Sequence, residues 1–205
     1  LRMIDNLKDT CESHARCNVI EVMGRGAGDI AINTGLAAGA TAVVVAEYPF
    51  NEAGLFERIE KSRKIGKRNF IVIVSEALGS DYGPYLTAKI ESITGVETRF
   101  SRPAHIVRGG NPTLRDRVLA SNMGVCAVEQ LLAGNSNIVV CSHNDDICAM
   151  DINYALTLDR FFKGKANAEE LSHFTRDQLG QMKMHSADRQ RRKDRLYEIV
   201  NKINL

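Results

Sequence analysis

The chain has 205 residues and a formal net charge of only +2, so its overall charge gives no reason to expect nucleic acid or an anionic membrane as a partner. It is 44% hydrophobic, which supplies enough apolar material for a buried core in one large domain or two small ones. The longest apolar run is far too short to span a bilayer, and no secretory signal opens the chain.

The cysteine pattern indicates a reducing compartment. Five cysteines form an odd set without a C-x-x-C pair, and they are Cys11, Cys17, Cys126, Cys141 and Cys148. Free thiols are typical of cytoplasmic proteins, in which most cysteines serve as small apolar residues of the core. We therefore expect a cytoplasmic protein with reduced cysteines.

Apolar strands alternate with amphipathic or small-residue helices along most of the chain. Fully apolar runs such as "FIVIV" suit parallel strands that are buried on both faces. The predicted strands are 17–23, 41–47, 68–76, 96–102 and 137–142, and the predicted helices are 28–40, 51–64, 84–93, 114–132 and one from about residue 146. This order predicts a three-layer α/β/α sandwich with a mainly parallel, Rossmann-like sheet.

The character of the chain changes at Lys163, where it becomes polar and helical. Thr175 and Gln178 have the spacing of a capping box. Further on, an apolar stripe at helical spacing predicts docking on the body or on a second subunit, and its members are Leu196, Ile199, Val200 and Ile203. The basic run 189–195 is interpreted as a solvated helix face. We expect an α/β domain over 1–162 and a helical extension over 163–205.

The pattern of the first residues is typical of the middle of an amphipathic helix. Leu1, Ile4 and Leu7 have helical spacing, yet no capping residue and no initiator Met precede them. We therefore expect the sequence to be part of a longer chain.

The loop "VMGRGAGDIA" joins the first strand to a helix and has the composition of an anion site. Gly24 and Gly26 allow a close approach of the backbone, and the start of the next helix offers free N–H groups. Arg25 adds a planar fork that can pair with phosphate or carboxylate. The alternative interpretation is an ordinary turn with an exposed arginine.

A dinucleotide-binding loop is a second alternative. Gly24, Gly26 and Gly28 come close to the G-x-G-x-x-G spacing, and Glu47 lies at a suitable distance along the chain for a ribose contact. However, Asp29 occupies the position of the third glycine, close to where pyrophosphate would lie. This hypothesis therefore ranks below a phosphate site of another kind.

Further charged residues follow or precede the predicted strands. They are Arg16, Glu76, Arg99, His105 and Arg108. Ligands of parallel sheets gather at the strand ends. Together with Arg25, these cations suit a small phosphorylated ligand, with the one carboxylate available for hydroxyl groups, and each shielded bond to phosphate is worth about 1.5–3 kcal/mol.

The motifs "VIEVMGRGAGDIA", "IVSEALG", "ETRFSRPAHIVRGGNPTLRDRVLASNMG" and "EQLLAG" resemble the carboxyl-terminal part of 6-phosphofructokinases, in order, from about Ile4 to Lys165. The tail resembles longer bacterial members more loosely. The resemblance implies phosphoryl transfer from ATP or pyrophosphate to the 1-hydroxyl of fructose 6-phosphate in glycolysis, with Mg²⁺.

The resemblance also implies roles for individual residues. Met23, Gly24 and Arg25 match the sugar-phosphate loop, and Arg25 would also face the transferring group as the catalytic residue. Glu76 matches the acceptor of sugar hydroxyls, and the pair near the 6-phosphate matches His105 and Arg108. Arg16 and Arg99 match arginines that reach into a neighbouring subunit's site. A homo-oligomer follows, usually a tetramer.

The departures from the family pattern matter equally. The glycine-rich donor loop and the T-I-D-N-D-type motif with the catalytic base have no match in this sequence, and "HNDD" at His143–Asp146 is interpreted as a helix start. Phosphoryl transfer needs donor, metal and base together, so the chain alone is expected to be inactive, with no metal site of its own. A non-catalytic phosphosugar-binding or regulatory paralogue remains the alternative.

An effector site is matched only in part. Lys8, Gly39 and Lys67 match the residue types of the effector site in bacterial members of the family. However, Thr41 stands where the metal-binding glutamate is expected. Two basic positions are also replaced, by Ile65 and Asn69. We expect ADP activation to be weak or absent.

Overall fold

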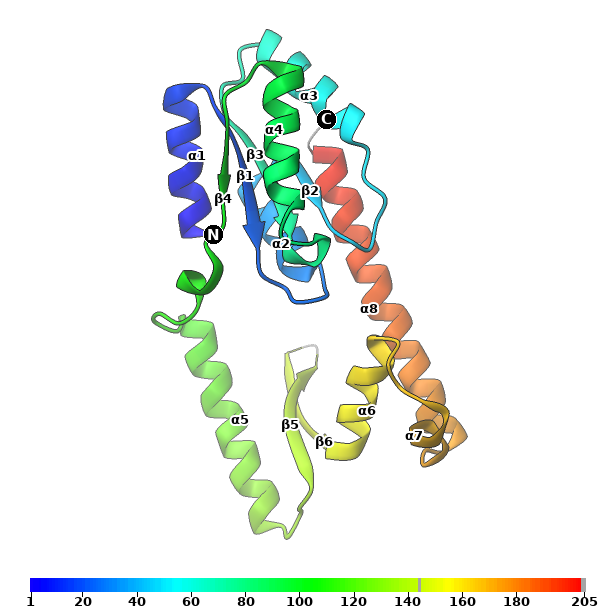
Figure 1. The fold of residues 1–205 in the computed structure, drawn as a ribbon. Helices are drawn as coiled ribbons and strands as arrows, with labels where there is room; N and C mark the ends of the chain where they lie inside the picture. The colour runs from blue at the N-terminus through cyan, green and yellow to red at the C-terminus, as the bar shows by residue number, and fades with distance from the viewer. Residues whose placement is uncertain (144, 204–205) are drawn as a thin grey trace. The chain divides into compact units, whose positions relative to one another are not determined.

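The computed structural model describes residues 1–143 and 145–203, which form two compact units. Unit 1 combines Leu1–Arg108 with the described residues from Arg192 onward, and unit 2 is Gly109–Arg191 (Figure 1). These units do not follow the expected division at Lys163. That division, between a family domain and an extension, stays a prediction.

Unit 1 is built on a parallel sheet. Its strands are β1 (Cys17–Val22), β2 (Ala42–Val44), β3 (Phe70–Ser75) and β4 (Thr98–Ser101). Their order is β2-β3-β1-β4, and every neighbouring pair is parallel. The central strand β3 contains the apolar run "FIVIV", which the sequence predicted to be buried on both faces, and it is buried throughout.

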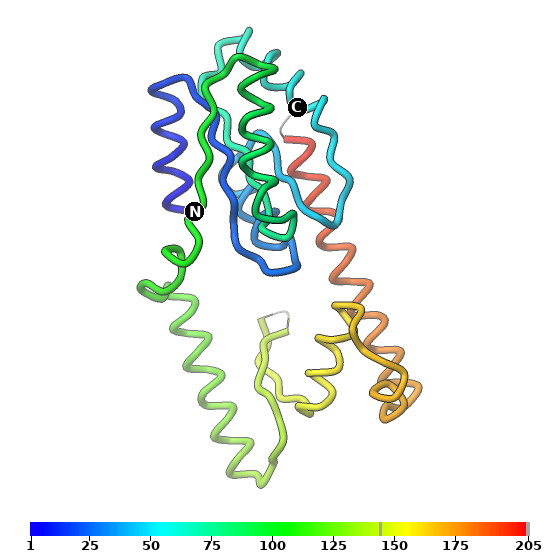
Figure 2. Tube along the Cα trace, in the orientation of Figure 1, coloured from blue at the N-terminus to red at the C-terminus, as the bar shows by residue number. Residues whose placement is uncertain are grey.

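Helices cover both faces of this sheet, which confirms the three-layer prediction. One core joins β1 and β3 to α3 (Glu52–Lys64) and α4 (Tyr82–Thr94). The other core joins the opposite strand faces to α1 (Arg2–His14), α2 (Asp29–Ala38) and the end of α8 (Arg176–Ile203). Figure 2 follows the path by which α8 returns to unit 1.

Three helix starts follow from capping residues. The Asn51 side chain accepts a 3.0 Å hydrogen bond from Gly54 N–H at the start of α3, as predicted. Thr113 and Asp116 form a capping box on α5 (Leu114–Leu132), whose bounds agree with the prediction. Thr175 and Gln178 form the expected reciprocal bonds before α8.

Unit 2 contains α5, a hairpin and several helices. β5 (Ile138–His143) pairs antiparallel with β6 (Asp146–Asp151), and α6 (Ile152–Phe162), α7 (Ala168–Ser172) and the first part of α8 follow. Within the described residues this hairpin is a separate two-stranded sheet and does not extend the parallel one.

The predicted helix from Asp146 is wrong. Residues 146–151 form β6, and the helix begins only at Ile152, capped by the Asp151 side chain. The interpretation of His143–Asp146 as a helix start is also wrong, because His143 ends β5 and Asp145 has the positive φ of 70° that suits a tight reversal. Asn144 of that motif lies outside the described residues.

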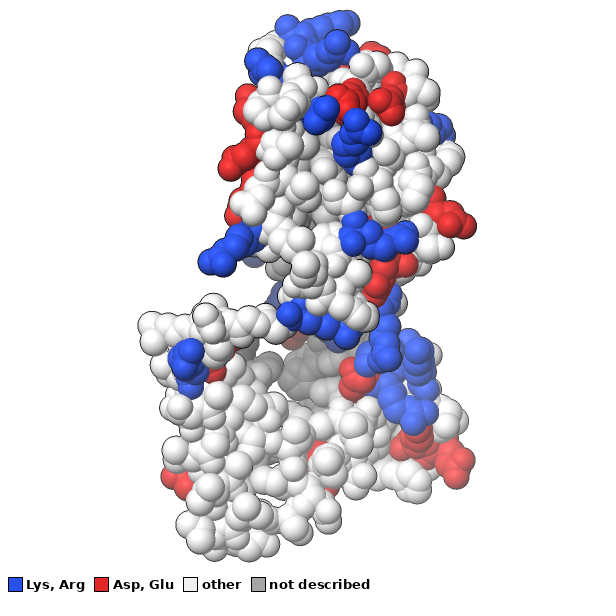
Figure 3. Space-filling view, turned by 60° about the vertical axis from the view of Figure 1, so that its left-hand side comes forward, with Lys and Arg blue, Asp and Glu red and all other residues white. Residues whose placement is uncertain are grey.

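The tail residues of unit 1 dock on the body, as the apolar stripe predicted. Val200 is fully buried in the second core, and Leu196 and Tyr197 pack against it, while Ile203 stays 54% exposed. The basic run is only partly solvated, since the side chain of Lys193 is 12% exposed. Opposite charges are mixed on the face of unit 1 drawn in Figure 3. Among the helices of the described residues, none is both long and apolar enough to cross a membrane.

Candidate functional site

The loop after β1 is fastened to the end of β3 by a carboxylate. Glu76 begins the short 3₁₀ helix η1 (Glu76–Leu78), and its Oε1 accepts hydrogen bonds from the backbone N–H groups of Gly24, at 3.0 Å, and Arg25, at 2.5 Å. Both strands are parallel neighbours, so their carboxyl ends meet at one edge of the sheet. This carboxylate therefore sets the path of the loop.

The electrostatics of Glu76 bring two more predicted residues to the same place. Hydrogen bonds from the Gly24 and Arg25 amides hold the pKa of the Glu76 carboxyl below its ordinary value, and the nearby charges of Arg108 and His105 lower it further. His105 lies in the 3₁₀ helix η2 (Ala104–Val107), and Arg108 follows it. The structure thus gathers residues from the ends of three strands.

Arg25 has an unusual backbone conformation. Its φ is +57°, in the left-handed region that side chains other than glycine rarely adopt. Its own N–H bond to Glu76 secures this conformation. The residue is exposed, so the loop presents an arginine and its flanking backbone at the sheet edge instead of packing it away. Such a strained position, kept by a specific contact, is typical of a functional loop.

Arg16 and Arg99 lie away from this cluster. Arg16 precedes β1, whereas the loop follows it, and six strand residues span about 20 Å. Arg99 pairs in register with Asn18 near the same early end of β1. Both arginines form ion pairs with Glu97, a residue that the sequence analysis missed. Within one chain they therefore make a separate cationic pair.

The far end of the loop is held by a second carboxylate. Glu47 Oε1 accepts hydrogen bonds from the Gly28 N–H at 2.7 Å and from Lys193 Nζ at 2.6 Å. A Cβ at Gly28 would lie 2.6 Å from Val45 and 2.8 Å from Glu47, so the position requires glycine. Burial opposes the ionisation of Glu47, but the bonds from Lys193 and Gly28 outweigh it and lower its pKa. Glu47, proposed above as a ribose contact, thus fastens α2 and α8.

An ion pair between a buried carboxylate of β1 and an exposed guanidinium lies next to the loop. Glu21 is 8% exposed and receives two bonds from Arg102, one from Nε at 2.7 Å and one from Nη2 at 2.9 Å. The guanidinium also lies over the ring of Phe100. The sequence did not predict this pair, although a glutamate inside the apolar strand "VIEVM" was a signal that a cation had to meet it.

The predicted effector residues lie close together on another side of unit 1. Lys8 Nζ donates to the Ala38 carbonyl beside Gly39, whose φ is +60°. Burial lowers the pKa of Lys67, and the charges of Lys8 and Arg58 lower it further, so the three cations are neighbours. Arg58, which the sequence analysis did not single out, donates to the Thr41 carbonyl. Within the described residues these cations form no ion pair.

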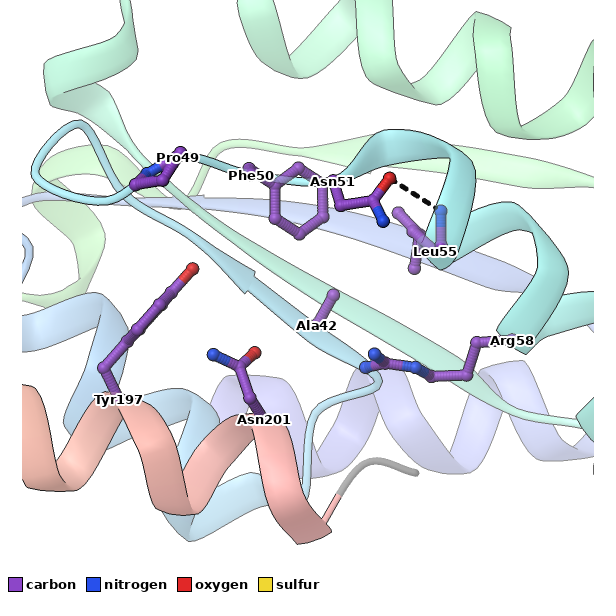
Figure 4. A pocket seen from close by; sticks show the side chains of 9 residues that line it. Ala42, Pro49, Phe50, Asn51, Leu55, Arg58, Tyr197 and Asn201 are labelled. Atoms are coloured by element: carbon purple, nitrogen blue, oxygen red, sulfur yellow. Dashed lines mark hydrogen bonds between the residues drawn. The ribbon is translucent and has the colours of Figure 1, made fainter.

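A pocket of about 210 Å³ opens beside Arg58. Figure 4 shows the guanidinium pointing into it, opposite Asn51 and Phe50, with Asn201 and Tyr197 of α8 closing another side. Tyr197 also stacks on Tyr48, with ring centroids 4.2 Å apart. Helix α8 therefore contributes a wall to the pocket beside Arg58.

The residues present do not suit a magnesium ion. Among the described residues no group of three or more His, Cys, Asp or Glu side chains could hold a metal, and the charges around the loop are mostly cationic. Mg²⁺ prefers carboxylate and phosphate oxygens. The described residues around this loop therefore suit an anion better than a metal ion.

A family model described as phosphofructokinase matches residues 1–131. The chain belongs to the phosphofructokinase family. Among its relatives, ATP-dependent 6-phosphofructokinase 1 of Clostridium perfringens is 45% identical over 159 residues, covering 78% of this chain and 49% of the relative. The ATP-dependent 6-phosphofructokinase of Clostridium botulinum strain Loch Maree is 43% identical over 162 residues, covering 79% of this chain and 50% of the relative. The chain thus spans about half the length of these phosphofructokinases.

Solved phosphofructokinase structures share the fold. A phosphofructokinase from Saccharomyces cerevisiae superimposes with a TM-score of 0.69 at 22% identity, covering 91% of this chain and 27% of that one. A pyrophosphate-dependent phosphofructokinase from Marinobacter aquaeolei superimposes with a TM-score of 0.60 at 25% identity. The match covers 74% of this chain and 43% of that one. The α/β sandwich with its helical extension is therefore a phosphofructokinase architecture.

Proposed function

We propose that this chain carries the sugar-phosphate half of a 6-phosphofructokinase, which transfers a phosphoryl group to the 1-hydroxyl of fructose 6-phosphate in the cytoplasm. The observation that carries the proposal is the gathering of Gly24, Arg25, His105 and Arg108 around Glu76. Arg25 and Arg108 supply the positive charge that a sugar phosphate requires, and His105 adds a ring nitrogen for hydrogen bonding at the same ligand-binding edge of a parallel sheet.

Each residue then has a distinct task. Met23, Gly24 and Arg25 line the sugar-phosphate loop, and His105 and Arg108 bind the 6-phosphate. Glu76 both fastens the loop and offers its remaining acceptor capacity to sugar hydroxyls. Arg25 also faces the transferring group, where a fixed charge stabilises the transition state more than the ground state.

The donor and Mg²⁺ are bound elsewhere in the complete protein. When bound there, Mg²⁺ would supply charge neutralisation during the transfer. ATP is the donor named for the curated relatives, and pyrophosphate the one named for the Marinobacter structure. The chain on its own is inactive, because it offers no donor loop and no catalytic base.

A shared site accounts for the two remaining arginines. Arg16 and Arg99 lie near the early end of β1, away from the loop of their own chain, and suggest a homo-oligomer, a tetramer by family resemblance, in which they contact the sugar phosphate of a neighbour. Glu97 holds both of them in place. Replacing Arg99 with Ala would then weaken sugar-phosphate binding and its cooperativity.

The proposal is tested with Arg25→Ala in the complete protein. We expect kcat to fall about 100-fold or more, as when a donor that acts in the transition state is removed. Arg63→Ala is the matched control. Arg63 lies on α3 and donates to the Thr94 carbonyl of α4, and these two helices cover the face of the sheet opposite to α2. Steady-state assays with fructose 6-phosphate measure both. A change confined to KM would contradict the role in transfer.

A non-catalytic phosphosugar-binding paralogue is the alternative function. Isothermal titration of the complete protein with fructose 6-phosphate separates the two. Binding without turnover, with either ATP or pyrophosphate supplied, would favour the paralogue.

We further propose that ADP activates the complete protein weakly or not at all. The cations Lys8, Arg58 and Lys67 cluster near Gly39, but Thr41 offers no carboxylate for the metal of a metal–nucleotide complex. Saturation curves for fructose 6-phosphate with and without ADP should nearly coincide. A clear shift caused by ADP would overturn this expectation.

A further inference from the structure

Two cysteines face each other across the hairpin of unit 2. Cys141 in β5 is the register partner of Cys148 in β6, and their sulfur atoms lie 3.4 Å apart. Both residues are half-buried, and Cys141 Sγ also lies 3.6 Å from the Cys148 carbonyl oxygen. The proposed phosphoryl transfer uses neither residue.

The other three cysteines are placed differently. Cys11 and Cys17 are buried in unit 1, where burial raises the pKa of both thiols. Cys126 lies on α5, near enough for its charge to act on Cys141. No three of these side chains could hold a metal within the described residues, so the close pair has no evident role as part of a metal site.

The geometry of the pair fits a covalent bond. Residues directly opposite in an antiparallel pair have Cα atoms about 4.5–5.5 Å apart, inside the range that disulfides span. The sulfur atoms must approach from 3.4 Å to the bond length of about 2.05 Å, which a rotation about χ1 can supply. We propose that Cys141 and Cys148 form a modification site: a dithiol that low-molecular-weight disulfides convert to a cross-strand disulfide.

The reaction proceeds in two exchanges with a small disulfide such as oxidised glutathione. One thiol loses its proton and attacks a glutathione sulfur, so a mixed disulfide forms and one reduced glutathione leaves. The second thiolate then attacks the protein sulfur of this mixed disulfide and displaces the second glutathione. The protein dithiol is oxidised by two electrons, and one glutathione disulfide becomes two thiols.

Two features make the site slow to react and reversible. Burial and the neighbouring thiol raise the pKa of Cys141, so little of it is thiolate at neutral pH. The rate of oxidation should therefore increase with pH. The bond would join adjacent strands at half-exposed positions, and such accessible links are the more readily reduced. We therefore expect dithiothreitol to restore both thiols completely.

The test incubates the purified chain with oxidised glutathione, blocks remaining thiols under native conditions, and locates the modification by peptide mass spectrometry. Wild type should lose the mass of two hydrogen atoms and yield one linked peptide pair containing Cys141 and Cys148. Cys126→Ser is the matched control, and it should form the same link. Circular dichroism checks that each variant is folded.

Cys148→Ser separates the site from unspecific oxidation. With its partner removed, Cys141 should retain one glutathione as a stable mixed disulfide, because the second exchange cannot occur. Loss of the link in Cys126→Ser, a link through Cys126 in wild type, or no link at any glutathione ratio would each overturn the proposal.

Discussion

Glu76 shows how one side chain can determine a loop. Its Oε1 receives the Gly24 and Arg25 amides, and its ionised form is favoured by those bonds and by Arg108 and His105. The bond from the Arg25 amide to this carboxylate accompanies the left-handed backbone of Arg25. The same group that would bind sugar hydroxyls is therefore also the group that builds the loop.

Glu76→Gln should remove a stabilisation that depends on pH. The pKa of Glu76 is lowered on folding, so its contribution is present above the ordinary value of 4.5 and is lost as the pH falls through the lower folded value. Wild type should therefore exceed the variant in melting temperature near neutral pH, with the difference vanishing in acid. Thermal unfolding from about pH 7 to about pH 3 measures this.

Glu57→Gln is the control for the melting experiment with Glu76→Gln. Glu57 is exposed and pairs with Lys61 on the surface of α3, and such pairs contribute little to stability. A difference for Glu76→Gln that persists unchanged in acid would show that the charge does not fasten the loop.

The sequence allowed most of the site's cations to be predicted but not their partners. Arg25, His105 and Arg108 follow strands, and the convergence of parallel strand ends is a general property of the fold. Arg99 lies only two residues from Glu97, within the period-2 pattern of a strand. In contrast, Arg16 is 81 residues from Glu97, and Arg102 is 81 residues from Glu21. Periodicity within one element carries no information about such distant pairs.

At the scale of elements, α8 is linked to the candidate site through Lys193. Its ammonium group contacts Glu47 at 2.6 Å and Asp29 at 3.5 Å, and Glu47 also holds the Gly28 amide at the start of α2. Tyr48, next to Glu47, donates to Asp194 of α8. The helix thus supports the loop that carries Arg25.

Lys193→Met should destabilise unit 1 by about 1–3 kcal/mol, because a partly buried carboxylate would lose its cation. Urea unfolding at neutral pH gives the free energy of unfolding. Lys193→Arg should retain most of the stability, and the double variant Lys193→Met/Glu47→Gln should recover part of it, since no charge then lacks a partner. Strictly additive losses would mean that the two side chains do not interact.

The element most poorly predicted was the one with the least regular pattern. "DICAMD" is a run of four apolar residues between two aspartates, so it lacks the alternation of a half-buried strand. "HNDD" has the acidic composition of a helix start. Pairing with β5 supplies the hydrogen bonds that decide the outcome, and such pairing depends on the partner strand. The long α5 and the capped α3 were predictable because the caps are local.

At the scale of the whole molecule, unit 1 is assembled from two distant stretches of chain, so its core should weaken when the later stretch is altered. Val200 is fully buried in the core that also contains Ile20 and Ile73 of the central strands. Val200→Ala should cost about 1–3 kcal/mol and lower the hydrogen-exchange protection of β1 and β3 amides together. Ile203→Ala, at a 54% exposed position of the same helix, should stay within about 0.5 kcal/mol of wild type. Equal effects of both substitutions, or protection lost in α8 alone, would mean that the helix covers the sheet without contributing to its stability.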